Sequence, residues 1–204
     1  MRVAYRDEPS IPAGGGEPAK GQQVSRPYRE LLIGCGSRRD KFVPLPHNPG
    51  WRNLTTLDLN ADHEPDVVAD LMQLPLPFED ETFDEIHAYE VLEHTGAQGD
   101  YLWFFAQFSD FWRLLKPGGH FAATCPAVDS RWAWGDPSHT RVLMHETLTF
   151  LVQPEYTKQV GRTAMSDFRH IYKADFDVPF SRTEDGVFAF CLQAVKPSRI
   201  EVHG

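Results

Sequence analysis

The stretch Glu30-Leu31-Leu32-Ile33-Gly34-Cys35-Gly36-Ser37 decides the fold predicted for this chain. Its first half is a short, mainly apolar run that suits a buried parallel strand, and it ends in two glycines one residue apart. Glycines at a strand end allow the backbone to approach a ligand where a side chain would collide. Taken alone, Gly-x-Gly is equally consistent with a tight turn, so the flanking sequence has to decide.

Strand-like runs recur downstream of this segment and alternate with crossover segments. They lie at residues 54–58, 67–70, 83–89 and 121–125, and two late strands are expected at 168–172 and 187–195. Strands joined by crossovers form right-handed βαβ units. We therefore expect an α/β fold with a doubly wound, mostly parallel, seven-stranded sheet, helices on both faces, and an antiparallel member among the closing strands.

The clearest helix is predicted between the fourth and fifth of these strands. Apolar side chains recur there at helical spacing and form one face, at Tyr101, Phe104, Phe105, Phe108, Phe111, Trp112 and Leu115. Asp100 is placed to cap the amino end, and Lys116-Pro117-Gly118-Gly119 ends the helix. An aromatic stripe of this kind is far more often core than a cofactor site, so we assign it to the core. A short helix is also expected over 146–152.

The composition of the 204-residue chain indicates a globular protein with one domain. Hydrophobic residues make up 41% and charged residues 24%, a balance typical of a globular protein, and the length suits one α/β domain. Residues 1–26 are rich in proline, glycine and polar residues, so we expect a flexible N-terminal arm followed by a single domain over 27–204. No segment approaches the ~18 apolar residues of a membrane span, and no secretory signal is visible, which favours a cytoplasmic protein without a membrane partner.

The cysteine spacing and the net charge limit which metals and ligands the chain is expected to bind. Cys35, Cys125 and Cys191 are far apart and are not spaced like a metal or redox motif, so reduced thiols and no metal ion are expected. The formal net charge of −9 disfavours nucleic-acid phosphates and favours a small-molecule partner. The oligomeric state is left open.

Acidic residues follow the second and third strands. Asp58 lies 22 positions after Gly36, where an acid can accept hydrogen bonds from a ribose diol. Asp70, at the end of the next strand, can accept one from an adenine amino group. An adenosine-containing cofactor is therefore expected. A nicotinamide dinucleotide is disfavoured, because Arg39 takes the third glycine position of its fingerprint and later prolines prevent the helix that would seat a pyrophosphate.

Together these blocks resemble the class I S-adenosylmethionine-dependent methyltransferases. The resemblance rests on Leu-Ile-Gly-Cys-Gly at 32–36, Leu-Asp-Leu-Asn at 57–60, Val-Val-Ala-Asp-Leu at 67–71, Phe-Asp-Glu-Ile at 83–86, Val-Leu-Glu-His at 91–94 and Leu-Leu-Lys-Pro-Gly-Gly at 114–119. The blocks cover about residues 30–126, in the order and spacing of the family. The resemblance implies S-adenosyl-L-methionine as the cofactor.

The resemblance also implies a cofactor site. The residues are Gly34, Cys35 and Gly36 for the methionine part, Asp58 and its neighbour Leu59 for the ribose, Asp70 and Leu71 for the adenine, and Tyr89 and Glu90 beside the sulfonium. The chain departs from the family pattern at Leu32, where an acid is usual, and at Arg38, which replaces a third glycine. Arg38 could instead pair with the carboxylate of the cofactor.

The segment 132–141 follows the fifth strand, which in this fold places it at the rim where an acceptor enters. Trp132, Trp134 and Arg141 are predicted to bind the acceptor, since two tryptophans and a His/Arg pair on a loop suit a binding surface. The alternative is a lid packed on the core, with Arg141 in a surface ion pair. His139 is the first candidate for a general base and His94 the second, with packing or capping as the alternative for His94.

These expectations favour a methyltransferase acting on an O or N atom of a small-molecule acceptor. One alternative is a protein that binds the cofactor without turnover and acts as a scaffold or regulator, which the departures at Leu32 and Arg38 keep open. A nucleic-acid methyltransferase is the third. Cytosine chemistry through Cys125 is disfavoured because no Pro-Cys block follows the fourth strand, and Cys125 is assigned to the core.

Overall fold

The computed structural model describes residues 27–200. The flexible arm expected over residues 1–26 lies outside the described residues, and the division into this arm and one domain over 27–204 stays a prediction.

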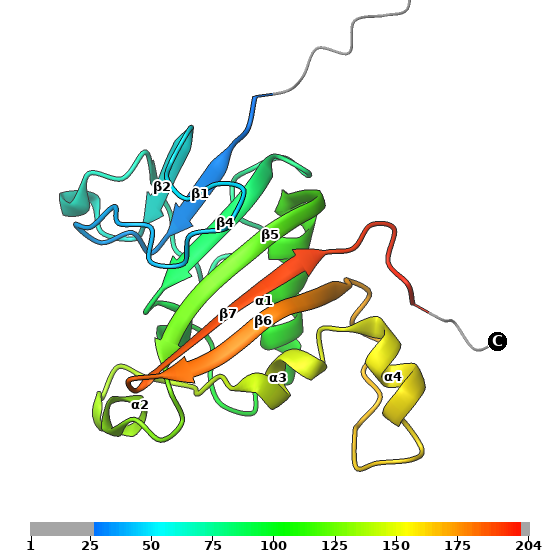
Figure 1. Ribbon diagram of the computed structural model, residues 1–204. Helices are drawn as coiled ribbons and strands as arrows, with labels where there is room; N and C mark the ends of the chain where they lie inside the picture. Colours follow the sequence, from blue (N-terminus) through cyan, green and yellow to red (C-terminus); the bar gives the residue numbers. More distant parts are fainter. Residues whose placement is uncertain (1–26, 201–204) are drawn as a thin grey trace, which may run out of the picture.

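A seven-stranded sheet forms the centre of the molecule, in the order β3-β2-β1-β4-β5-β7-β6 (Figure 1). The strands are β1 Glu30–Ile33, β2 Leu54–Asp58, β3 Val67–Val68, β4 Phe83–Tyr89, β5 Leu115–Pro126, β6 Phe176–Glu184 and β7 Val187–Ala194. Strands β1 to β5 pair in parallel, whereas β7 runs antiparallel to both of its neighbours, β5 and β6. The α/β class and the strand number are confirmed, and the sheet is mixed.

The helices are few and mostly short. They are η1 Ala61–His63, η2 Leu92–His94, α1 Tyr101–Leu114, α2 Arg131–Gly135, α3 His145–Thr149 and α4 Gln153–Gln159. Helix α1 confirms the predicted amphipathic helix, and the Asp100 side chain accepts a hydrogen bond from the Trp103 N–H as its N-cap. The strand expected at 168–172 is wrong. The sixth strand is β6, where Pro179 interrupts the sequence pattern but is tolerated because β6 lies at the edge of the sheet.

The two faces of the sheet are covered differently (Figure 1). Helix α1 packs on one face, where Phe108 and Phe111 meet Phe121 of β5. Over residues 27–200, the opposite face of β1, β4 and β5 carries no helix and is covered by the irregular segment 37–52, which places Val43 against Ala122. The expectation of helices on both faces is therefore wrong for this part of the chain, because the prolines of the segment do not allow a helix there.

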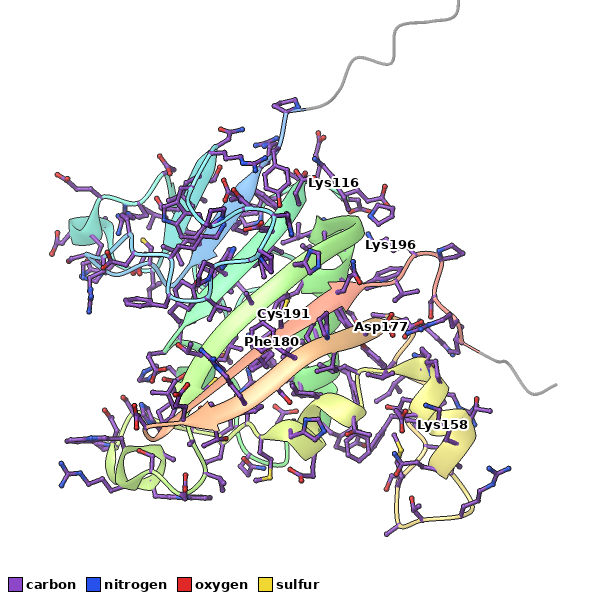
Figure 2. The ribbon with its side chains drawn as sticks, in the orientation of Figure 1. Lys116, Lys158, Asp177, Phe180, Cys191 and Lys196 are labelled. Carbon is purple, nitrogen blue, oxygen red and sulfur yellow. The ribbon has the colours of Figure 1, made fainter. Side chains whose placement is uncertain are left out.

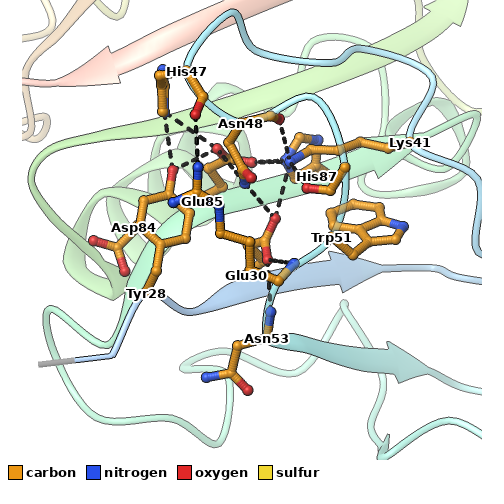
Figure 3. Close-up of polar contacts among 12 residues, drawn as sticks. Tyr28, Glu30, Lys41, His47, Asn48, Trp51, Asn53, Asp84, Glu85 and His87 are labelled. Carbon is orange, nitrogen blue, oxygen red and sulfur yellow. Dashed lines mark hydrogen bonds and ion pairs between the residues drawn. The ribbon is translucent and has the colours of Figure 1, made fainter.

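A buried polar network fixes segment 37–52 to the sheet (Figure 3). Lys41 Nζ donates to Glu30 of β1 at 3.0 Å and to Glu85 of β4 at 2.5 Å, and the Asn48 amide donates to the same two carboxylates. Both glutamates are fully buried. Burial alone would raise the pKa of Glu85, but hydrogen bonds from His87 and Lys41 outweigh it and hold the pKa well below its usual range. Charged side chains thus hold segment 37–52 on the sheet face where a helix was expected.

Candidate active site

The turn after β1 leaves room for a ligand because it is built from two glycines. Gly34 and Gly36 have φ angles of +59° and +51°, which L side chains rarely adopt. A Cβ added to Gly34 would lie 2.3 Å from Val91 Cγ2, whereas one added to Gly36 would meet nothing within 4 Å. Gly34 is therefore required by close packing, and Gly36 keeps the backbone open beside it.

The Asp58 carboxylate, at the end of β2, is tied to this turn. It accepts hydrogen bonds from the Gly36 N–H at 2.8 Å and from the Asn60 N–H at 2.9 Å. Burial alone would raise the pKa of Asp58, but the Asn60 and Gly36 N–H groups outweigh it and hold the pKa below its usual value. Because a carboxylate offers about four lone-pair sites, this ionised group keeps acceptor capacity for a ligand. The adjacent Leu59 is exposed.

The end of β3 lies beside Asp58. The Ala69 N–H donates to the Asp58 carbonyl at 3.0 Å, which brings Asp70 to the same edge of the sheet. The Asp70 carboxylate accepts from the Met72 N–H, and Leu71 packs into the core. The structure thus brings together the two acids selected from the sequence, on neighbouring strand ends.

Strand β4 ends in Tyr89 and Glu90. Glu90 has a φ of +52°, and its N–H donates to the Thr124 carbonyl of β5. Burial raises the pKa of Glu90. The Tyr89 hydroxyl accepts from the Val43 N–H at 3.2 Å and contacts His87 Nδ1 at 2.7 Å. Tyr89 therefore ties segment 37–52 to the sheet, while the backbone changes direction at Glu90, directly after the strand.

A cavity of about 1010 Å³ opens at the ends of β1 and β4 and extends over the sheet to the β6–β7 hairpin, while Asp58, Leu59, Asp70 and Leu71 lie outside its lining. The glycine turn, Tyr89 and Glu90 line one part of it. Phe42, Val43, Pro44, Phe180 and Ala189 form an apolar wall, and Arg182, Glu184 and Asp185 add charged groups. Phe180 of β6 stands in register with Cys191 of β7, and Figure 2 labels both in the middle of the sheet. The cavity is thus continuous from the glycine turn to residues of the last two strands, which the sequence analysis did not select.

Comparison with known proteins identifies the family of this fold and site. Residues 31–123 match the family model described as a methyltransferase domain. The chain therefore contains a methyltransferase domain of the S-adenosylmethionine-dependent class. No curated protein matches its sequence.

Solved structures resemble this methyltransferase in fold at low sequence identity. A SAM-dependent methyltransferase from Archaeoglobus fulgidus is 18% identical with a TM-score of 0.52, and the match covers 81% of this chain and 86% of that one. The N-methyltransferase NodS from Bradyrhizobium japonicum WM9, solved in complex with S-adenosyl-L-homocysteine, is 16% identical with a TM-score of 0.49, and the match covers 82% of this chain and 78% of that one.

The residues at the strand ends fit S-adenosylmethionine. The glycine turn leaves backbone exposed to the cavity, as the close approach of a ligand requires. Asp58 retains acceptor capacity beside this turn, and Asp70 adds a second acid on the next strand. The individual contacts assigned to these residues stay predictions.

The two arginines after the glycine turn, Arg38 and Arg39, have different environments. Arg38 lines the cavity with a largely exposed side chain that pairs with Asp40 and lies over the Phe42 ring. Arg39 donates to the Gly36 carbonyl at 2.6 Å and to the His63 carbonyl at 2.8 Å. Arg38 is therefore free to meet a ligand, while Arg39, which the sequence analysis treated only as a missing glycine, holds the turn in shape.

The structure separates the three residues predicted to bind the acceptor. Trp132 and Trp134 lie on α2, and their residues are 59% and 68% exposed. Arg141 is buried, and its guanidinium donates to the Leu92 carbonyl and to the side chains of Thr95 and Gln107. The cavity lining includes none of the three, and a surface ion pair for Arg141 does not form among the described residues. The geometry gives Arg141 a role in fixing η2 to α1.

The two histidines considered as general bases lie together. Their ring centroids are 4.6 Å apart, and His139 Nε2 lies 4.0 Å from an oxygen of Glu93, a residue the sequence analysis left unassigned. Burial raises the pKa of Glu93 to about 7. Neither histidine lines the cavity, although both lie close enough to Glu90 to influence its charge.

Among the helices of residues 27–200, none combines the length and apolar character needed to cross a bilayer.

Proposed function

We propose that this methyltransferase transfers a methyl group to an oxygen or nitrogen atom of a small-molecule acceptor. The observation that supports this is the continuous cavity between the glycine turn and the apolar wall at Phe42 and Phe180. Small-molecule sites occupy about 300–1,000 Å³ and are mainly apolar with a few polar groups. The cavity of about 1010 Å³ has room for the methionine end of the cofactor and a small acceptor.

The strand ends would hold the cofactor. Gly34 to Gly36 would approach its methionine part, Asp58 its ribose and Asp70 its adenine, with Arg38 available to the cofactor's carboxylate. S-adenosylmethionine supplies a methyl group already activated by the sulfonium. The work left to the chain is to bind, to exclude water and to align the acceptor, which can contribute several kcal/mol of the barrier.

The acceptor would enter from the side of the β6–β7 hairpin. Phe180 and Val43 offer it apolar contact, and Glu90 stands where the acceptor region meets the glycine turn. An acceptor that carries a proton needs a group to receive it, and His139 and His94 are the candidates carried over from the sequence. The net charge of −9 supports a small molecule over a nucleic acid, and a cytoplasmic location is proposed with it.

Calorimetric titration of the full chain tests the cofactor site. Micromolar binding of S-adenosylmethionine and S-adenosylhomocysteine, about −8 kcal/mol, with no binding of NAD is the expected result. Failure of both adenosine compounds to bind would overturn the proposal.

Incubation with S-adenosylmethionine carrying an isotope-labelled methyl group, across a panel of hydroxyl and amine acceptors, then tests transfer. A labelled small-molecule product supports the proposal. Saturable cofactor binding with no product on any acceptor would favour the scaffold alternative. A labelled nucleic acid, bound with strong salt dependence, would favour the nucleic-acid alternative.

A further inference from the structure

Three side chains with metal-binding atoms meet behind the end of β4. Glu93 and His94 lie on η2, and His139 comes from the loop after α2. One ligand atom from each lies within 4.8 Å of the other two. Ligand atoms around a tetrahedral ion with bonds of ~2.1 Å lie ~3.4 Å apart, so side-chain adjustments of up to about 1.4 Å close the cluster around one ion.

The Glu93 carboxyl group is buried, and the Cys125 thiol of β5 is a polar neighbour. The residue is 2% exposed, and neither of its carboxylate oxygens has a hydrogen-bond partner among the described residues. An unsatisfied buried carboxylate costs several kcal/mol unless a proton or a cation compensates it. Arg141 lies nearby, but its guanidinium is committed to Leu92, Thr95 and Gln107. The structure thus places a buried carboxyl group with unused acceptor capacity 4.0 Å from His139 Nε2.

His94 is oriented as metal-binding histidines usually are. His94 Nδ1 lies 3.3 Å from the Ser138 carbonyl and 3.1 Å from its hydroxyl, which leaves Nε2 unengaged. A second contact of this kind, from the other ring nitrogen to a carbonyl, fixes the tautomer and the ring orientation in metal sites. His94 is exposed, whereas the His139 side chain is 8% exposed and its Nδ1 has no hydrogen-bond partner within the described part of the chain.

We propose that Glu93, His94 and His139 form a binding site for one divalent transition-metal ion. Two imidazoles and one carboxylate suit Mn²⁺, Fe²⁺, Co²⁺ or Zn²⁺, and a three-ligand site leaves coordination positions open. The sequence predicts no metal ion, because these ligands come from segments that are distant along the chain and carry no metal-motif spacing.

The site adjoins the proposed active site. Glu90 lines the cavity three residues before Glu93, and His94 and His139 lie close enough to influence its charge. Resting on the proposed function, the inference places the ion behind Glu90, outside the cavity lining, where it would take the place of the general-base role proposed for His94 and His139.

Metal binding alone tests the site. The full chain, without an affinity tag and stripped with a chelator, is titrated calorimetrically with CoCl₂ and MnCl₂, and the Co²⁺ complex is followed by visible absorption. One-to-one binding with a micromolar Kd is expected. Glu93→Gln, which keeps the shape of the side chain, and His139→Ala should each weaken it by about 10–100-fold or more. His170→Ala, at an exposed histidine outside the cluster, is the matched control and should bind as the wild type does.

Two outcomes would overturn the site: no one-to-one binding up to millimolar metal, or binding that is unchanged in Glu93→Gln and His139→Ala variants shown to be folded by circular dichroism. Titration with S-adenosylhomocysteine in the presence of chelator separates this inference from the proposed function. Cofactor binding without metal binding contradicts the metal site alone, and metal binding without cofactor binding contradicts the proposed function alone.

Discussion

Single residues at the strand ends carry the strongest constraints of this molecule. Gly34 combines a left-handed backbone with contact against Val91, and Asp58 joins the glycine turn to the end of β2. Each is required by a specific neighbour, so each can be tested by one substitution.

Asp58→Ala should weaken binding of S-adenosylmethionine by about 1.5–3 kcal/mol, the scale of a hydrogen bond to a charged group. Isothermal calorimetry measures the change, and Asp62→Ala, at an exposed acid on η1, serves as the control. An unchanged affinity in Asp58→Ala would remove the ribose assignment.

Gly34→Ala should destabilise the protein more than Gly36→Ala. Both changes place a side chain at a positive φ, at a cost of roughly 1–2 kcal/mol. Only the first adds a clash with Val91, worth about 1–3 kcal/mol more. Urea unfolding measures both, and the double variant Gly34→Ala/Val91→Ala should recover part of the difference. Equal losses in the two single variants would contradict the packing argument.

At the scale of elements, segment 37–52 covers a sheet face in place of a helix. Its hold on the sheet depends on Lys41 between two buried carboxylates, with Asn48 beside it. This segment also supplies Phe42, Val43 and Pro44 to the cavity wall. Its attachment therefore connects the stability of the fold to the shape of the proposed acceptor site.

Lys41→Met should lower the free energy of unfolding at pH 7 by about 3–5 kcal/mol, because it leaves Glu30 and Glu85 buried without their cation. Lys158→Met, at an exposed ion pair on α4, should change it by less than about 1 kcal/mol. Chemical denaturation compares the two variants with the wild type. A loss at Lys41 no larger than that at Lys158 would show that the network does not hold the segment.

At the scale of the whole molecule, the same network gives stability a dependence on pH. The pKa values of Glu30 and Glu85 are lower in the folded protein, since their hydrogen bonds outweigh the burial that would raise them. A depressed carboxyl pKa contributes stability that is present above the unfolded value of ~4.3 and is lost as the pH falls through the folded value. Acid should therefore weaken the protein from about pH 5 downward.

The deficit of Lys41→Met relative to the wild type should then shrink between pH 6 and pH 3, because protonated carboxyl groups no longer need the lysine. Denaturation curves of both proteins at several pH values measure this difference. A deficit that stays constant down to pH 3 would show that Glu30 and Glu85 are not the groups that Lys41 stabilises.

The sequence by itself determined the α/β class, strands β1 to β5, helix α1 with its Asp100 cap, and the placement of Asp58 and Asp70 at strand ends. These features follow from local patterns: a strand or helix is encoded by the spacing of its own apolar residues, and parallel strands end at a common edge. The family blocks at 30–126 added the cofactor for the same reason, since their order and spacing lie within the chain itself.

Only the tertiary structure decided the covering of the second sheet face, the position of β6, the cavity wall at Phe180 and the meeting of Glu93 with His139. Each depends on contacts between segments that are distant in sequence, and such contacts leave no periodic signal. In the sequence, Lys41, Glu30 and Glu85 have the charged side chains that are typical of a protein surface. Pro179 interrupts the strand pattern of β6, so this edge strand was not predicted. These charged residues become buried and form a network only when the chain has folded. The same holds for the burial of the Glu93 carboxyl group.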